Sequence, residues 1–411
     1  MRFAIFLIFC SLAFAHNTQA KNSKFELVGH CQFEPDKPKT NLFHYLFSCF
    51  PKKEQAQDPI SFAGLSAVEI LETLNDSSLF ENTELGHGSF GITSLSSRYF
   101  TTRVKKYSPR GRYRGTYNEK KTTQERYVIK IETDYCKNLR LSKGEQSFME
   151  EAQFLKKMLP SDYVIDLIAA GEDHHGNFFI ITKYGGDDLK EALHELIFFG
   201  DLKKHVRILH KFLFATQADL VEAGISYLDW KLENIVLDAS GARLKLKLID
   251  FGLAESLIDG YLGKSRSGTP STASPEVYSS KSKLGYNALY ANSFSIGATA
   301  ILFENQKTRG LVEAFSILDK NKRSIEAINY YHNILRDLAS TQYLKDLLDP
   351  KPHMRLHYNP KIKSWIKKVH DDDGEDSEQQ TYKIFNPSSL KYVGEFQLPE
   401  TYLDKSSRLL I

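Results

Sequence analysis

Four polar side chains near the middle of the 411-residue chain have types and spacing suited to group-transfer chemistry. Asp229 precedes Lys231 by two residues and Asn234 by five, and Asp250 follows Asn234 by sixteen. A carboxylate in such a set can accept the proton of an attacking hydroxyl, and a lysine can neutralise charge on a transferred phosphoryl group. An amide oxygen and a second carboxylate can hold Mg²⁺. We therefore interpret Asp229 and Lys231 as catalytic, and Asn234 and Asp250 as metal ligands.

The stretch from Tyr227 to Asn234, followed by Asp250-Phe251-Gly252, resembles the catalytic loop and metal-binding motif of eukaryotic protein kinases. The resemblance implies a two-lobed α+β fold, with a small β-rich N-lobe that carries one main helix and a larger helical C-lobe. It also implies that ATP with Mg²⁺ or Mn²⁺ binds in the cleft, and that a protein substrate offers a Ser or Thr acceptor. For the loop alone, a surface Asp and Lys ahead of an ordinary strand is the alternative.

Further motifs lie upstream in the order that the resemblance requires. Gly86, Gly88 and Gly91 form the pattern G-x-G-x-x-G, with Phe90 as the aromatic lid of the kinase phosphate loop. Alone this pattern is weak, because it also occurs in dinucleotide-binding folds, where it opens a helix. Lys130 follows thirty-nine residues after Gly91 in a strand-like run, from which its ammonium is expected to reach the phosphates.

The spacing of apolar residues predicts a helix over 142–158 and strands over 163–170 and 178–184. On the helix, Glu151 matches the family's conserved glutamate and is the expected partner of the strand lysine. Glu150 is the neighbouring alternative.

The second of these strands leads into a segment that resembles the kinase hinge. The resemblance assigns Thr182 as the gatekeeper residue and places Tyr184 in the backbone segment that binds adenine. Just beyond, Asp187 or Asp188 would either reach the ribose or cap the helix that follows.

Three positions around the catalytic loop depart from the family pattern. Leu228 stands where an arginine usually anchors a phosphorylated activation segment, so we expect no switching by phosphate there. Asn292 replaces an aspartate that braces the loop, and an amide accepts such a hydrogen bond more weakly than a carboxylate. Together with Tyr227 and Thr272, these departures favour the rival interpretation, a pseudokinase that serves as a binding scaffold.

The activation segment keeps other features of the family. Thr269 combined with Lys231 is the Ser/Thr-specific version of the motif. Glu276 needs a buried cationic partner, because an unpaired buried charge is costly, and Arg355 holds the family position for it.

A basic segment over 98–126 is much longer than the usual kinase turn. It contains ten Lys or Arg, two Glu and four interleaved Tyr, and we interpret it as a loop. Such a loop could dock an acidic protein, an anionic membrane or RNA, and a solvated insertion is the alternative. The chain's net charge of +3 is too small to predict a specific nucleic-acid partner, and we expect a monomer.

The first residues predict secretion. Met1-Arg2 precedes a short apolar run that ends in small residues, which is typical of a signal peptide. No later apolar run approaches the ~20 residues that span a bilayer. The predicted address is the exterior or the secretory lumen, with delivery into a host cell as a further possibility. There Cys31 and Cys49 could pair, leaving Cys136.

These observations divide the chain into four parts: a signal peptide over 1–20, an extension over 21–78, a kinase-like domain over 79–369, and an acidic linker with a tail over 370–411. Within the domain, the N-lobe covers 79–184 and the C-lobe 185–369. Helices are expected to continue to about residue 369.

Overall fold

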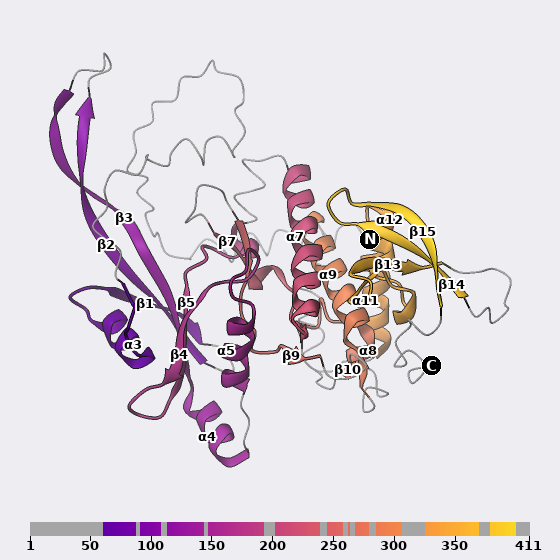
Figure 1. The fold of residues 1–411 in the computed structure, drawn as a ribbon, viewed down its shortest axis with the longest axis horizontal. Coiled ribbons are helices and arrows are strands. Elements are labelled where there is room, and N and C mark those ends of the chain that lie inside the picture. The colour runs from indigo at the N-terminus through magenta and orange to yellow at the C-terminus, as the bar shows by residue number, and fades with distance from the viewer. Residues whose placement is uncertain are drawn as a thin grey trace, which may run out of the picture. The chain divides into compact units, whose positions relative to one another are not determined.

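A computed structural model describes most of the chain between residues 61 and 399 (Figure 1). The described ranges are 61–87, 91–107, 113–143, 147–192, 202–238, 245–257, 262–263, 268–278, 285–305, 325–369 and 379–399. The predicted signal peptide, Cys31, Cys49, Gly88, Phe90 and the acidic linker therefore lie outside the described residues. Among the described helices, none combines the length and apolar character that crossing a bilayer requires.

The small lobe is β-rich, as the resemblance implied, and is built on a five-stranded antiparallel sheet. The strand order is β1-β2-β3-β5-β4. The strands are β1 (Glu81–His87), β2 (Gly91–Tyr107), β3 (Tyr113–Glu132), β4 (Leu167–Glu172) and β5 (Phe178–Lys183). The strand expected from residue 163 starts later, at Leu167, because Val164 instead forms a bridge with Leu248 of the large lobe.

A helix packs on each face of this sheet. Along β5, Ile180 belongs to the core under α5 (Ser147–Lys157), whereas Phe179 and Ile181 join the core under α3 (Ala67–Asn75). This alternation follows from the two-residue period of a strand. Because α3 shares a core with the sheet, the boundary predicted at residue 78 passes through the small lobe.

Two helices, not one, occupy the region predicted as a helix over 142–158. They are α4 (Asp134–Lys143) and α5, and residues 144–146 between them are not described. The second contains the glutamate expected to pair with the strand lysine.

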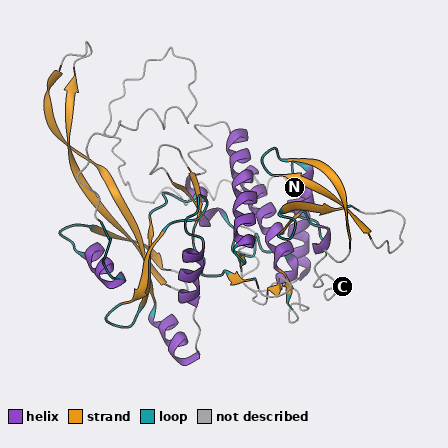
Figure 2. Ribbon diagram, in the orientation of Figure 1, coloured by secondary structure: helices purple, strands orange, loops and turns teal. Residues whose placement is uncertain are grey.

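The large lobe is mainly helical, as Figure 2 shows, and it is organised around α9 (Ala288–Glu304). This helix is apolar and buried nearly all round, which is typical of a central helix. Its neighbours are α7 (Leu202–Glu222), α8 (Pro275–Tyr278), α11 (Ile325–Leu338) and α12 (Gln342–Leu347). Short strand pairs and single turns frame the site: β6 (Ile225–Ser226) with β9 (Glu255–Ser256), β7 (Ile235–Asp238) with β8 (Lys245–Leu248), β10 (Leu262–Gly263) with β11 (Tyr286–Asn287), η1 (Leu232–Asn234) and η5 (Pro352–Met354).

The end of the chain forms a four-stranded antiparallel sheet, so the expectation of helices up to residue 369 was wrong. Its strands are β12 (His357–Asn359), β13 (Ser364–Lys368), β14 (Gln379–Asn386) and β15 (Lys391–Pro399). Phe385 and Trp365 pack against Phe214 of α7, with ring centroids 4.9 and 4.7 Å away. The tail thus packs back on the large lobe, and the boundary at residue 369 divides this sheet.

The basic segment over 98–126 is a β-ribbon in the structure, which corrects its interpretation as a loop. Strands β2 and β3 continue to pair from Arg98 opposite Glu125 out to Tyr107 opposite Tyr113. Figure 1 shows the two strands running on together past the other strands of the sheet. The residues of the turn, 108–112, are not described.

Candidate active site

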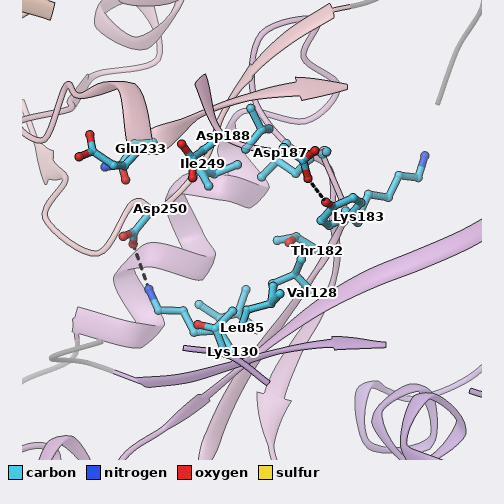
Figure 3. Close-up of a pocket in the computed structure, with 18 of the residues that line it drawn as sticks. Leu85, Val128, Lys130, Thr182, Lys183, Asp187, Asp188, Glu233, Ile249 and Asp250 are labelled. Carbon is cyan, nitrogen blue, oxygen red and sulfur yellow. Dashed lines mark hydrogen bonds and ion pairs between the residues drawn. The ribbon is translucent and has the colours of Figure 1, made fainter. Parts of the chain in front are cut away.

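A cavity of about 460 Å³ lies between the small-lobe sheet and the large lobe. Figure 3 shows side chains from both lobes around it. Its apolar lining was missed by the sequence analysis and consists of Leu85, Val128, Leu155, Ile165, Ile180, Val236 and Ile249. Most of these residues lie in strand-like apolar runs beside predicted site residues, which was the available signal.

Three charged residues meet at one end of the cavity. Lys130 Nζ lies 2.8 Å from Glu151 Oε2 and 3.0 Å from Asp250 Oδ1. Glu151 is buried, whereas Glu150, the alternative, is exposed. Figure 3 shows Lys130 and Asp250 pointing toward one another from opposite lobes. The structure therefore brings together residues that are 21 and 120 positions apart in the sequence.

The electrostatics of this cluster keep its lysine charged. Burial alone would lower the pKa of Lys130, but the carboxylates of Glu151 and Asp250 raise it above its ordinary value. Burial would likewise raise the pKa of Asp250, and the lysine beside it lowers that pKa below the usual range. A cationic amine and an ionised carboxylate thus face the cavity together.

Contacts with an aromatic residue hold the backbone on either side of Asp250. Asp250 has a φ of 59°, a left-handed conformation that Asp tolerates better than most residues. The next residue, Phe251, is buried, and its ring centroid lies 5.1 Å from that of Tyr227. The Tyr227 hydroxyl donates to the carbonyl of Ile249 at 2.7 Å. Tyr227 therefore fixes the strand end that presents the carboxylate.

Asp229 is surrounded by hydrogen-bond donors. Its Oδ2 accepts from Lys231 Nζ at 2.6 Å and from Asn234 Nδ2 at 3.0 Å. Its Oδ1 accepts from the Thr269 hydroxyl at 2.6 Å, a contact made across 40 residues. Asn234 Nδ2 also donates to the Asp229 carbonyl, so the Asn234 amide nitrogen is engaged, and its oxygen is the atom suited to a metal ion.

The loop that carries Asp229 rests on the central helix α9. The Trp230 indole donates to Asn292 Oδ1 at 3.2 Å, and the Thr299 hydroxyl donates to the Trp230 carbonyl at 3.1 Å. Asn292 Nδ2 donates in turn to Ser226 Oγ at 2.8 Å. Asn292 thus contacts the loop as expected, although through the side chain of the neighbouring tryptophan.

Thr182 and Tyr184 both line the cavity, but the backbone amide of Tyr184 already has a partner within the protein. It donates to the Arg126 carbonyl at 3.0 Å. The prediction that this segment binds adenine through its backbone stays a prediction, and Lys183 and Gly185 border the cavity beside Tyr184.

Close packing explains the two glycines of this segment. A Cβ on Gly185 would lie 2.4 Å from Val236 Cγ2, and one on Gly186 would lie 2.1 Å from the Leu237 carbonyl. The hinge therefore passes closer to β7 than any side chain would allow.

The two acidic residues after the hinge differ in their contacts. Asp188 accepts from the backbone amides of Lys190 and Glu191 at 2.9 and 3.0 Å, so it caps the helical turn that follows. Asp187 accepts from the Tyr184 hydroxyl at 2.8 Å. Both line the cavity, and of the two predicted roles the cap applies to Asp188.

The glycine-rich segment is described in part. Gly86 lies in β1 and Gly91 begins β2, where a Cβ would lie 2.8 Å from both the Ile131 carbonyl and the Phe148 ring. Gly91 is therefore required by close packing against β3 and α5. Thr93, two residues on, lines the cavity.

Comparison with known families decides the identity of this fold. The model of the protein kinase domain matches residues 110–366, more than half of the chain. The chain belongs to the protein kinase family. The match begins at residue 110, between β2 and β3, so the glycine-rich segment over 86–91 lies before it.

Named relatives agree with this assignment over shorter stretches. The chain is 31% identical over 159 residues to a serine/threonine-protein kinase of Drosophila erecta, covering 38% of this chain and 20% of that protein. It is 29% identical over 167 residues to a probable serine/threonine-protein kinase of Dictyostelium discoideum, covering 40% and 27%. It is 30% identical over 143 residues to G protein-coupled receptor kinase 4 of Rattus norvegicus, covering 35% and 24%. The chain thus spans only about a fifth to a quarter of the length of these relatives.

The residues present fit the ATP and divalent metal ion that protein kinases use. The apolar lining of the cavity provides a slot for a flat base, and the hinge backbone borders it. Lys130 supplies a cation for phosphate oxygens, and Asn234 and Asp250 supply the oxygen donors that Mg²⁺ prefers.

The activation segment of this kinase is held by an apolar cluster and one buried ion pair. Leu228 is buried among Val277, Tyr286, Ala288 and Ala291. Gly268 has a φ of 124°, and a Cβ there would lie 2.9 Å from the Leu228 carbonyl. The position usually taken by an arginine is therefore part of a packed hydrophobic contact.

The predicted ion pair of this kinase is also present. Arg355 is fully buried and donates to Glu276 through both terminal nitrogens, at 2.5 and 3.0 Å. Two further donors of the guanidinium reach the carbonyls of Asp349 and Tyr290 at 2.8 and 3.0 Å. All three guanidinium nitrogens are thus satisfied, as a buried arginine requires.

Proposed function

We propose that this chain is an active protein serine/threonine kinase, which transfers the γ-phosphoryl group of ATP to a Ser or Thr hydroxyl of a protein substrate. The observation that carries the proposal is the position of Asp229, held between Lys231, Asn234 and Thr269 at 2.6 to 3.0 Å. These donors orient a carboxylate whose basicity can serve an incoming hydroxyl. Membership of the kinase family supports the reaction class.

The proposed reaction assigns one task to each polar residue. Bound ATP and its metal ion supply the phosphoryl group and positive charge at the phosphates. Asp229 accepts the proton of the substrate hydroxyl. The hydroxyl oxygen then bonds to the γ-phosphorus of ATP, and the bond from that phosphorus to the ADP oxygen breaks. Lys231 and Lys130 neutralise phosphate charge, and Asn234 and Asp250 hold the metal ion.

Two features support Ser and Thr as acceptors. The hydroxyl of Thr269 and the ammonium of Lys231 both bond to Asp229, which matches the Ser/Thr-specific version of the motif. Two of the relatives described above are themselves named serine/threonine-protein kinases.

The test is phosphate transfer by the purified full-length chain. With radiolabelled ATP, Mg²⁺ and a peptide library, phosphoserine and phosphothreonine should appear, and Asp229→Ala should remove them. Phosphotyrosine as the main product would contradict the acceptor assignment. A chain that binds ATP but transfers nothing to any peptide would instead be the scaffold-type pseudokinase that Leu228 and Asn292 favour.

We also propose that the protein is secreted, on the basis of the sequence of residues 1–20. The destinations are the exterior, the secretory lumen, or another cell into which the kinase is delivered. Expression of the full chain in a secreting cell, followed by mass spectrometry of its N-terminus, tests this proposal. A product that retains Met1 and stays inside the cell would contradict it.

A further inference from the structure

Phosphoryl transfer makes no use of the basic ribbon, defined here as residues 98–107 of β2 and 113–126 of β3. The pairing of β1 with β2 ends at Glu81 opposite Ser97, and the pairing of β5 with β3 ends at Tyr127 opposite Lys183. Past these positions β2 and β3 pair only with each other among the described strands. The ribbon therefore projects as a two-stranded extension of the small-lobe sheet (Figure 1).

A two-stranded ribbon has two open backbone edges. In an antiparallel pair, each strand directs about half of its backbone donors and acceptors away from its partner. An extended peptide can pair with such an edge as an added strand, using main-chain hydrogen bonds for affinity. Within the described part of the chain, no third strand covers either edge of the ribbon, and its base is closed only at Arg126, whose carbonyl accepts from the Tyr184 amide.

The sequence of the two ribbon strands determines which charge the ligand should carry. The strands, 98–107 and 113–126, include eight Lys or Arg against two Glu, although the chain as a whole carries only +3. Lysine on an edge strand suppresses pairing with a second copy, because like charges would face each other. An acidic strand would meet the opposite charge and complete the open ladder.

We propose that the basic ribbon is a docking arm for an extended acidic segment of a partner protein, which binds as an added β-strand. The open edges and the excess positive charge are independent observations, and an acidic peptide satisfies both. RNA or an anionic membrane would use the charge alone, and neither needs an ordered backbone edge. This proposal does not depend on the acceptor specificity of the kinase.

The base of the ribbon is attached to the hinge of the nucleotide cavity. The Arg126 guanidinium lies 4.1 Å from the centre of the Tyr184 ring, and the Arg126 carbonyl accepts from the Tyr184 amide. The Tyr184 hydroxyl donates to Asp187 beside the cavity. A protein docked on the ribbon is thereby anchored to the lobe that forms one wall of the active site.

Fluorescence anisotropy on the full-length chain tests the docking arm. The probes are a labelled peptide that alternates Glu and Val, its counterpart with Lys in place of Glu, and a version of the acidic peptide with alternate backbone nitrogens methylated. The acidic peptide should bind, the lysine peptide should not, and methylation should weaken binding by about tenfold or more, because it removes backbone donors.

Charge-reversal variants locate the site. Lys105→Glu with Lys120→Glu in the ribbon should weaken binding of the acidic peptide by at least about tenfold. The matched control, Lys361→Glu with Lys391→Glu, changes the net charge equally at exposed positions near the C-terminal sheet and should leave binding within about twofold. Both variants should phosphorylate a peptide that lacks an acidic segment at the wild-type rate, and both should melt like the wild type.

Each other result would overturn the proposal. If the methylated peptide binds as tightly as the unmethylated acidic peptide, the peptide does not bind as an added strand. If both charge-reversal variants lose binding equally, the ribbon is not the binding site. Tighter binding of single-stranded RNA or of anionic lipid vesicles, lost in the ribbon variant, would assign the arm to that class of partner. Absence of binding by any acidic probe would leave the ribbon without a docking role. Because basal transfer is measured in parallel, failure of this proposal is distinguishable from failure of the kinase activity.

Discussion

Two groups of charged residues in this kinase use the same chemistry for different purposes. Lys130, Glu151 and Asp250 meet beside a cavity, and the Asp250 side chain is 46% exposed. Arg355 and Glu276 meet inside the large lobe, where the arginine side chain is 0% exposed. In the first group the ammonium and a carboxylate still face space that a ligand can enter, whereas in the second group the protein satisfies all three guanidinium nitrogens.

The difference shows how burial separates a binding site from a structural brace. A charge that faces a cavity can exchange a protein partner for a phosphate oxygen or a metal ion at small cost to the fold. An ion pair with a fully buried arginine, such as Arg355 with the 18% exposed Glu276, cannot lose a partner without leaving a poorly solvated charge unpaired. We therefore expect substitutions in the first group to affect catalysis, and substitutions in the second to affect stability.

The largest effect should follow from substitutions in the cavity cluster. Asp250→Asn and Lys130→Met should each lower phosphate transfer by about a thousandfold, because each removes a charge that acts on phosphate in the transition state. Steady-state rates and melting temperatures of both variants measure this. Lys245→Met is the control, since it removes an exposed ion pair with Asp162 at 2.7 Å. Normal turnover in both variants would show that Lys130 and Asp250 do not carry the phosphate transfer.

The next largest effect should be structural. Arg355→Ala should lower the free energy of unfolding by about 3–5 kcal/mol, because it leaves Glu276 without its buried partner. Urea unfolding measures this change, with Lys351→Ala as an exposed control from the same loop. A loss of less than about 1 kcal/mol would place this pair with ordinary surface ion pairs.

A smaller effect concerns the pH dependence of stability, which we expect from His332 beside the Arg355–Glu276 pair. Burial, and then the charge of Arg355, lowers the pKa of His332 to about 3, and its ring lies 4.6 Å from that of Phe294. The unfolded chain therefore binds a proton at this position below about pH 6.5, where the folded chain does not. Stability should fall as pH decreases through that range.

The variant His332→Gln measures how much of the pH-dependent loss of stability is due to His332. Between about pH 7.5 and about pH 5.5, the wild type should lose about 1.4 kcal/mol more unfolding free energy than the variant. Urea unfolding at both pH values tests this, and equal losses in the two proteins would show that His332 is protonated in the folded state.

The smallest effect should come from removing phosphate. Because Leu228 packs in an apolar cluster where an arginine would bind a phosphate, the activation segment should keep its arrangement without modification. Complete dephosphorylation, verified by intact mass, should change the specific activity by less than about twofold. A drop of about tenfold, restored by rephosphorylation of the segment, would show that another cation takes the place of the arginine.

Predictions from sequence were most successful where residues lie close along the chain. Asp229, Lys231 and Asn234 fall within one loop, so chain connectivity alone brings their side chains near each other. Pairing of Lys130 with Glu151 was also predictable, because a strand followed by a helix in the small lobe places them on facing elements. The distance between Lys130 and Glu151 along the sequence was therefore enough to predict that they pair.

Contacts between distant segments were harder to predict. The hydroxyl of Thr269 reaches Asp229, and Asn292 contacts the loop at the Trp230 indole. The hydrogen bond from the Tyr184 amide to the Arg126 carbonyl was not predicted either. Each outcome depends on side-chain packing and local register, which no spacing in the sequence reveals.

The basic ribbon and the tail show the same limit at the level of the fold. Charged and polar residues have low strand propensity, so residues 98–126 were interpreted as a loop, but the ladder begun by neighbouring strands continues through them. The tail has short strand-like pieces, and contacts such as the packing of Phe385 on Phe214 and on Tyr343 decide where they lie.

The sequence by itself determined the kinase family, the order of its motifs and the residues with the chemistry for phosphoryl transfer, because these depend on residue type and short spacing. The tertiary structure decided which charges face the cavity, which are buried braces, and where the apolar wall of the cavity lies. These properties depend on burial and on contacts between segments far apart in the chain, and packing alone sets them.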